Sequence, residues 1–192
     1  VAVLGLHKPA GYACTRSDPE GRPTVFELLP SPPGGRWISV GRLDFMTGGL
    51  LLFTTDGELA YRLMHPSREV EREYAVRIRG ALNADQRRML LDGIDIGDGV
   101  ARFDAVADAG GTEGNHWYHV VLREGRNREV RRLVEAVGLE VSRLLRVRYG
   151  PILMPGRIRA GRWWHLESDE VERLRHAAGL RPPVRRRPEP DS

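Results

Sequence analysis

The chain has little of what disulfide frameworks, metal centres and membrane spans require. Cys14 is the single cysteine among 192 residues, so it can form neither an internal disulfide nor a cysteine-based zinc site. The six histidines lack ligand spacing, and no apolar run approaches the roughly 20 residues of a membrane helix. Because the start of the chain also lacks a signal-peptide pattern, the sequence predicts a soluble cytoplasmic protein without metal or redox cofactor.

Lysine is nearly absent too, although the chain is basic. Lysine and arginine together number 30, Lys8 is the only lysine, and the formal net charge is +4. Arginine binds phosphate through a bidentate fork and stacks on bases, which favours nucleic acid as the partner. A coding bias against lysine would give the same composition, so the placement of the arginines has to decide between the two explanations.

Short apolar or alternating runs indicate strands, and helical spacing of apolar residues is less frequent. The links between the runs are short and often contain glycine, which favours antiparallel pairing and an α+β fold. A Pro/Gly turn is expected at 31–35 and a glycine-rich loop at 109–114. Strands are predicted at 3–6, 37–40, 50–54, 74–78, 117–122 and 144–149, and helices at 57–65, 83–91 and 127–137.

The end of the chain differs in composition from the rest. Residues 181–192 hold four prolines and three successive arginines with almost no apolar side chain. Such a segment cannot bury enough apolar surface to fold, so we expect a disordered Arg/Pro-rich tail. The folded unit should therefore lie within residues 1–180.

Asp44 is the acid most clearly set apart by its surroundings. It follows Gly41-Arg42-Leu43 and precedes Thr47-Gly48-Gly49 and the apolar run 50–54. A fold that buries this run presents the carboxylate at the rim of a cleft. Aspartate is also common in turns, where its side chain bonds to the backbone, and spacing alone favours this plainer role.

The run 41–57 resembles the GRLD-x-x-T-x-GLLL-x-T-x-DG signature of the pseudouridine synthases that modify bacterial ribosomal RNA. Further segments agree with this family in the expected order, so the resemblance covers nearly the whole chain to about residue 166. The pattern is most similar to members that act on the large-subunit RNA. The agreeing segments are 8–11, 18–24, 63–66, 73–74, 124–132 and 142–150.

Three features depart from the family pattern. Met46 stands where Asn is expected and Gly48 where Ser is expected, which changes the loop beside Asp44. Family members often carry a small RNA-binding domain ahead of the Lys-Pro motif, whereas seven residues precede Lys8 here. The chain is therefore expected to be a shortened or a naturally short form.

The resemblance implies the pseudouridine synthase fold, which is a curved, mostly antiparallel mixed sheet with flanking helices and a central catalytic cleft. It also implies the reaction, in which the N-glycosidic bond of one uridine in a ribosomal RNA stem-loop is cut, the base rotates and it is rejoined through carbon. The target nucleotide must first flip out of its helix. Residues 1–180 are then the catalytic domain of a monomer that needs no cofactor, with Asp44 and Arg131 on separate lobes.

By this resemblance Asp44 is the catalytic carboxylate, which attacks the sugar or removes a sugar proton, and both routes stay open. Arg131 would hold this carboxylate in its charged form, and Tyr74 would stack on the base. Without the resemblance, Arg131 is better explained as a surface residue paired with Glu135, and Tyr74 as a core residue.

Side chains for substrate binding follow from the same motifs. By resemblance, Leu144 forms the apolar wall on the other face of uracil, with Leu145 an equal competitor for the register. The stretch 123–148 holds eight arginines against four glutamates, which suits contacts with RNA phosphates. The candidates for RNA binding are Lys8, Arg42, Arg126 and Arg128.

Other functions stay open at this point. A non-catalytic RNA-binding or ribosome-assembly module on the same fold would account for Met46 and Gly48, and action on small-subunit RNA is the alternative within the family. A glycoside hydrolase would need paired carboxylates such as Asp44 and Asp56. Asp56 is better explained as the N-cap of the helix that follows it.

Overall fold

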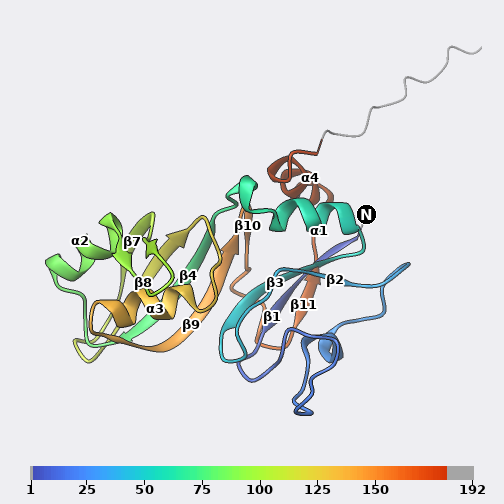
Figure 1. The fold of residues 1–192 in the computed structure, drawn as a ribbon. Coiled ribbons are helices and arrows are strands. Elements are labelled where there is room, and N and C mark those ends of the chain that lie inside the picture. Colours follow the sequence, from blue (N-terminus) through green and yellow to red (C-terminus); the bar gives the residue numbers. More distant parts are fainter. Residues whose placement is uncertain (1, 181–192) are drawn as a thin grey trace, which may run out of the picture.

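The computed structural model describes residues 2–180 and shows a mixed sheet covered by helices (Figure 1). Within these residues nine strands join in one sheet, and β5 (Ile94–Asp95) with β6 (Val100–Ala101) forms a separate hairpin. The nine strands are β1 (Val3–Lys8), β2 (Ile38–Val40), β3 (Gly48–Thr54), β4 (Arg72–Arg79), β7 (Ala105–Gly111), β8 (Asn115–Leu122), β9 (Glu140–Tyr149), β10 (Ile152–Leu153) and β11 (Trp163–His165). The helices are α1 (Gly57–Met64), α2 (Ala84–Asp92), α3 (Glu129–Ala136) and α4 (Ser168–Ala177), with short 3-10 turns η1 (Val25–Leu28) and η2 (Pro66–Arg68). No helix in this part of the chain has the length and apolarity to cross a bilayer.

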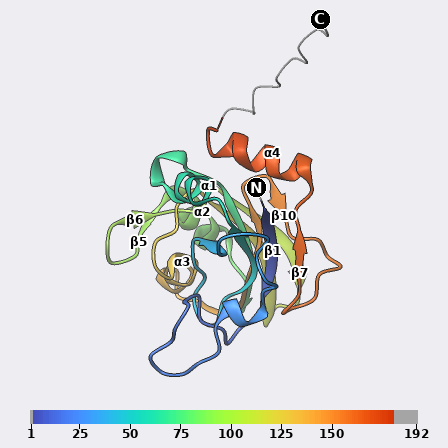
Figure 2. The same cartoon turned by 90° about the vertical axis from the view of Figure 1, so that its right-hand side faces the viewer.

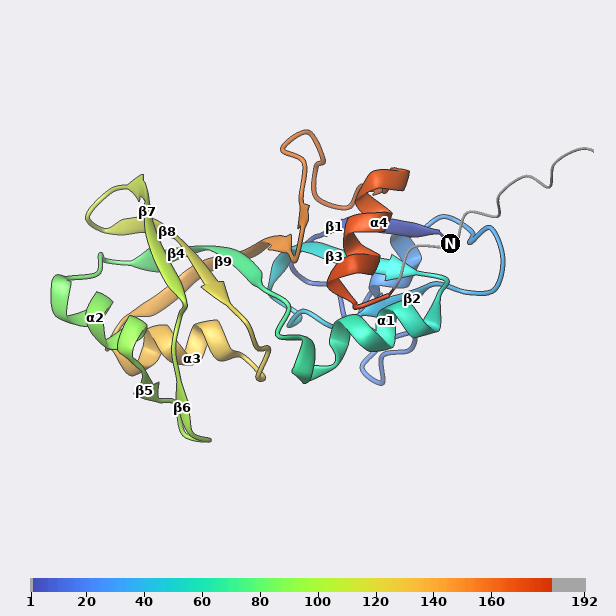
Figure 3. The ribbon, with the colours of Figure 1, turned by 90° about the horizontal axis from the view of Figure 1, so that it is seen from above.

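The sheet has two halves that meet at one pair of strands. Its order is β11-β1-β3-β9-β4-β8-β7, with β2 beside β3 and β10 beside β9. Across residues 2–180 the pairs are antiparallel except β3 and β9, which run parallel and share two register positions, Gly48 with Leu145 and Gly49 with Arg146. Figures 1 and 3 show the halves side by side, on either side of this joint. The predicted α+β fold with a mixed, mostly antiparallel sheet is confirmed.

The first half is built around β3. All seven residues of this strand are buried, as predicted from the apolar run, because both of its faces are covered. Leu50 and Leu52 contribute to one core, which also contains residues of α1 and α4, whereas Leu51 and Phe53 contribute to a second core with Val25 of η1. Figure 2 shows α4 above α1 and the start of β1. Each such buried side chain contributes about 1.5–3 kcal/mol, so β3 anchors the loop that precedes it.

The second half buries one face of its sheet against helices. Val76 of β4, Val120 of β8 and Leu144 of β9 belong to one core with Leu133 and Val134 of α3. Alternate residues of the strands point to this face of the sheet, and they pack against the apolar face of α3 that the helical spacing in the sequence predicted. This packing fixes the start of α3, and with it the arginine-rich loop, against the sheet.

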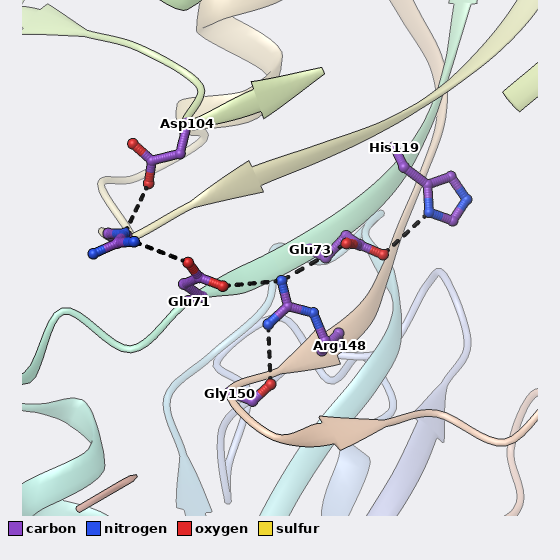
Figure 4. Close-up of polar contacts among 7 residues, drawn as sticks. Glu71, Glu73, Asp104, His119, Arg148 and Gly150 are labelled. Atoms are coloured by element: carbon purple, nitrogen blue, oxygen red, sulfur yellow. Dashed lines mark hydrogen bonds and ion pairs between the residues drawn. The ribbon is translucent and has the colours of Figure 1, made fainter. Parts of the chain in front are cut away.

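A network of charged side chains joins β4, β8 and β9 (Figure 4). Glu73 precedes Tyr74 in β4, so the two side chains lie on opposite faces of the strand. Arg148 of β9 lies 3.3 Å from Glu71 and 3.7 Å from Glu73. Partly exposed ion pairs contribute about 0–1 kcal/mol each, so the network adds little stability and mainly fixes β4 against β9. The same network includes Arg123, Asp104 and His119.

Every predicted strand and helix is present, but one expected loop is wrong and several short elements were missed. β7 runs to Gly111 and takes in the first part of the loop expected at 109–114. Its residues are mostly exposed alanine, aspartate and glycine, which lack the apolar alternation of a half-buried strand. β11 and α4 are short or polar, and each is held by the core around β3. The tail expected at 181–192 lies outside the described residues.

The joint between the halves yields a stability test. Gly49 has a φ of +102°, and a Cβ there would overlap the main chain of Arg146. Gly49→Ala should therefore lower the free energy of unfolding by at least about 3 kcal/mol more than Gly97→Ala does. Gly97 is the matched control, because its φ is +109° and a Cβ there meets nothing within 4 Å. Urea denaturation measures both losses, and equal losses would mean that the close approach does not restrict this position.

Candidate active site

A cavity of about 1000 Å³ opens where the two halves of the sheet meet. The first half contributes the loop before β3, and the second contributes β4, β9 and the loop before α3. Such a volume, with polar and apolar groups in the wall, fits a ligand of nucleotide size. Seven of the eight residues singled out from the sequence line it, namely Asp44, Tyr74, Arg131, Arg42, Leu144, Arg126 and Arg128.

Asp44 lies in the short loop between β2 and β3. The N–H of Thr47 donates to the main-chain oxygen of Asp44 at 3.0 Å and closes the loop. The residue is half-buried, and among residues 2–180 no hydrogen bond or ion pair within 4.0 Å engages its carboxylate. The side chain therefore does not cap the turn, and its carboxylate is available to a ligand in the cavity.

Lys8 does not make the RNA contact expected of it. Its side chain is fully buried and does not line the cavity. The ammonium donates to the main-chain oxygens of Asp44, Phe45 and Thr47 at 3.2, 3.0 and 2.7 Å. It also donates to that of Pro9 at 3.0 Å, and burial lowers the pKa of Lys8 to about 8. The binding role is wrong because this ammonium is used inside the protein, where it fastens the Asp44 loop to the end of β1.

Arg131 reaches the same loop from the first turn of α3. Its Nη2 lies 3.4 Å from Oγ1 of Thr47, and its Nε is buried without a hydrogen-bond partner in the described part of the chain. Burial lowers the pKa of Arg131, as does the charge of Arg128, whereas the charge of Asp44 raises it. No ion pair with Glu135 forms within 4.0 Å. The surface-residue explanation is wrong, and Arg131 faces Asp44 within one cavity.

Tyr74 and Leu144 give the cavity apolar walls. Tyr74 of β4 is half-buried and packs against the cores of both halves, so it is both a core residue and a lining residue. Leu144 of β9 is buried and lines the cavity, whereas Leu145 lies against Gly48 at the joint. The register of β9 thus selects Leu144 over Leu145 as the apolar wall.

The three arginines expected to bind RNA differ in their surroundings. Arg42 and Arg128 are exposed, and neither forms an ion pair within 4.0 Å in the part of the chain described. Arg126 is tied to the β5–β6 hairpin, since it lies 3.5 Å from Asp98 and its Nη2 donates to the main-chain oxygen of Val100 at 3.1 Å. Arg42 and Arg128 therefore present unpaired guanidinium groups, while Arg126 holds its own loop in place.

Two buried charged residues of the cavity wall were not assigned a role from the sequence. Arg146 of β9 and Glu129 of α3 are each 3% exposed. Burial, with the neighbouring Glu124 side chain as the second cause, raises the pKa of Glu129 to about 8. Both residues lie in segments that agree with the family pattern, 124–132 and 142–150, and alternation with Leu144 along β9 is a further signal for Arg146. Within residues 2–180, no group of three or more His, Cys, Asp or Glu side chains is arranged to hold a metal ion.

Comparison with known proteins places the chain in a family. The model of the RNA pseudouridylate synthase family matches residues 2–136, and the chain belongs to that family. Ribosomal large subunit pseudouridine synthase B of Pseudomonas aeruginosa is 56% identical over 181 residues, which cover 94% of this chain and 47% of that protein. The protein of the same name from Escherichia coli (strain K12) is 58% identical over 180 residues, which cover 94% of this chain and 62% of that protein. The chain thus spans about half the length of the curated relatives it matches.

A solved structure supports the same placement. A crystal structure of pseudouridylate synthase is 26% identical, with a TM-score of 0.79 over 90% of this chain and 73% of that chain. The family and the pseudouridine synthase fold predicted from the motifs are therefore confirmed. The similarity to proteins named for the large ribosomal subunit is confirmed as well.

The buried ammonium of Lys8 gives a first test of the site. Lys8→Met removes the donor to four main-chain oxygens, so the free energy of unfolding should fall by about 2–4 kcal/mol. Leu6→Met on the same strand is the control, because a volume-conserving apolar change at this buried site should cost less than about 1.5 kcal/mol. Urea denaturation measures both, and similar losses would contradict the role of the ammonium.

Glu129 gives a test by pH. Its pKa is about 8 in the folded state against an ordinary 4.5, so between these values the folded state keeps a proton that the unfolded chain has released. Rising pH in this window therefore destabilises the protein. Glu129→Gln removes this titration, whereas the exposed control Glu135→Gln keeps it. Between pH 5 and 8 the melting temperature should fall less for Glu129→Gln than for the wild type and Glu135→Gln. Parallel falls in all three proteins would contradict the raised pKa of Glu129.

Proposed function

We propose that this chain converts a uridine of large-subunit ribosomal RNA to pseudouridine, with Asp44 as the catalytic carboxylate. The observation that carries the proposal is the convergence of Asp44, Arg131 and Tyr74 on one cavity, from separate halves of the sheet. Family membership and the names of the relatives support the same reaction and the same RNA. The reaction needs an acid beside the sugar and an apolar slot for the base, and the cavity has Asp44 for the first and Tyr74 with Leu144 for the second.

Asp44 would act on the sugar of the bound uridine. Its carboxylate engages no partner within the described residues, and Lys8 holds the loop that carries it through three main-chain oxygens of residues 44, 45 and 47. Arg131 faces it, and the charge of Asp44 raises the pKa of that guanidinium. A carboxylate held in a fixed position serves either route, attack on the sugar carbon or removal of a sugar proton.

Tyr74 and Leu144 would hold the base after the nucleotide has flipped out of its helix. Flipping costs a few kcal/mol, which contacts with the rest of the RNA must offset. Arg42 and Arg128 are exposed at the cavity and free of ion pairs among residues 2–180, so they are the best placed to bind flanking phosphates. Arg126 would act indirectly, by positioning the loop that carries Arg128.

The other functions considered from the sequence have less support. Met46 is 59% exposed and does not line the cavity, and a Cβ at Gly48 would come within 2.8 Å of Leu145, so glycine fits its neighbours there. Neither departure therefore argues for a non-catalytic module. Asp56 caps α1, since its Oδ1 accepts the N–H groups of residues 58 and 59 at 3.0 and 3.2 Å, and it lies outside the cavity wall. A glycoside hydrolase with paired carboxylates therefore has no support from Asp56, because this acid does not share the cavity with Asp44.

We propose that residues 1–180 act as one catalytic domain, because Leu174 and Ala178 near the end of the described chain share a core with β3. We further expect the domain to be a monomer that works in the cytoplasm on an RNA stem-loop. Sedimentation of the purified chain checks the oligomeric state.

Tritium release tests the proposed activity. With ribosomal RNA labelled at C5 of uracil, the wild type should release tritium, because C5 loses its hydrogen when it bonds to the sugar. Asp44→Asn should lower the rate by at least about 1000-fold while RNA affinity stays within about threefold, since the lost carboxylate acts in the reaction rather than in binding. The matched control Asp56→Asn keeps an N-capping oxygen and should release tritium at the wild-type rate.

The labelled substrates separate the alternatives. Large-subunit and small-subunit RNA are tested in parallel, each as naked RNA and as precursor particles. Release from small-subunit RNA alone would transfer the proposal to that substrate. Binding without release on any substrate would favour the non-catalytic module, and normal release by Asp44→Asn would remove Asp44 from the mechanism.

A further inference from the structure

Arg146 is a buried cation in the cavity wall that the proposed mechanism does not yet use. Its Nε donates to the main-chain oxygen of Leu50 at 2.8 Å, and its Cζ lies 5.0 Å from the centre of the Tyr149 ring. The residue is 3% exposed, and its Nη2 has no hydrogen-bond partner within residues 2–180. No carboxylate of that part of the chain lies within 4.0 Å of it. A buried guanidinium is costly unless a partner satisfies it, which points to an acceptor that arrives with a ligand.

The position of Arg146 limits which part of a nucleotide can be that acceptor. It pairs with Gly49 on one side and with Tyr74 on the other, so it lies at the joint between the halves. Arg42 and Arg128, which line the same cavity, are exposed. Phosphates of the RNA backbone would therefore meet the exposed arginines, whereas the flipped base enters deepest and meets the buried one.

The free nitrogens of the guanidinium match an acceptor on the base. The Nε of Arg146 already serves Leu50, which leaves the N–H groups of Nη1 and Nη2 as donors. The buried Nη2, which has no partner within residues 2–180, suits a carbonyl oxygen, and uracil has two, O2 and O4. We propose that Arg146 binds the flipped uracil by donating a hydrogen bond from Nη2 to one of these carbonyl oxygens. This inference rests on the proposed function and names a contact of the same site.

The contact would also act on the reaction itself. When the bond between N1 and the sugar carbon breaks toward the base, its electron pair stays on uracil, and the negative charge is shared by O2 and O4. A guanidinium at either oxygen stabilises this charge in a site that excludes water. The charge is released when C5 bonds to the sugar carbon, after which C5 loses its proton and N1 takes one up.

A cycle of substrate and enzyme changes tests the contact. Synthetic stem-loops carry uridine, 2-thiouridine or 4-thiouridine at the position that the wild type modifies, since sulfur is a weaker acceptor than oxygen. Wild type, Arg146→Met and Arg146→Lys are compared by kcat/KM for pseudouridine formation. The control is Arg148→Lys, on the same strand but bound to Glu71 and Glu73 outside the cavity.

The wild type should lose about tenfold in kcat/KM with sulfur at one of the two positions, while Arg146→Met loses no more than about twofold there. Arg146→Met should itself lower kcat/KM for uridine RNA by at least about tenfold, and Arg148→Lys should show the wild-type sulfur effect. A purely structural role of Arg146 would lower all rates but leave the sulfur effects of wild type and variant equal. The inference would therefore be overturned if wild type and Arg146→Met showed the same sulfur effect at each of the two positions.

Thermal unfolding shows which variants are folded. If neither Arg146 variant folds, the wild type alone decides. A loss of kcat/KM with sulfur at one position supports the contact, and an unchanged kcat/KM with sulfur at each of the two positions overturns it. Turnover of uridine RNA by the wild type separates a failure of the proposed function from a failure of the Arg146 contact. Without turnover, both the proposed function and the inference are overturned. Normal turnover, with the same sulfur effects in wild type and Arg146→Met, would overturn the inference alone.

Discussion

The close approach of β3 and β9 at Gly49 and Arg146 is the constraint on which the rest of the structure depends. The two strands share only two register positions there, and no side chain fits between their main chains at Gly49. One strand leads out of the Asp44 loop, and the other carries the apolar wall and the buried arginine. Because the halves of the sheet meet so narrowly, a cavity remains between them at the joint, and residues distant in the chain line it together.

The basic residues of the chain have different roles because they lie at different depths. Lys8 is fully buried and holds the Asp44 loop, Arg131 is partly buried and faces the carboxylate, and Arg42 is exposed at the cavity. Other arginines of the stretch 123–148 form ion pairs within the protein, among them Arg148. Composition alone left a coding bias and RNA binding equally open. Their surroundings separate the arginines that are used within the protein from those that are free at the cavity, since a guanidinium already paired with a carboxylate is not available to a phosphate.

A part of the fold and site followed from local patterns. The unbroken apolar run of β3 predicted a strand buried on both faces, and Asp56 before a helical pattern predicted an N-cap. The ordered motifs predicted the family and brought Asp44, Tyr74 and Arg131 forward as candidates, all of which line one cavity. Such patterns are readable because apolar periodicity and capping depend on residues close together in the chain.

The amino-acid sequence by itself therefore determined the main strands, three of the four helices of residues 2–180, the family and the identity of the candidate acid. Only the tertiary structure decided that Lys8 points inward, that Leu144 rather than Leu145 lines the cavity, and that Glu129 is buried with a raised pKa. These outcomes depend on strand register across the joint and on which charges lose contact with water. Both are set by contacts between segments far apart in the sequence, and no local pattern of residue types carries that information.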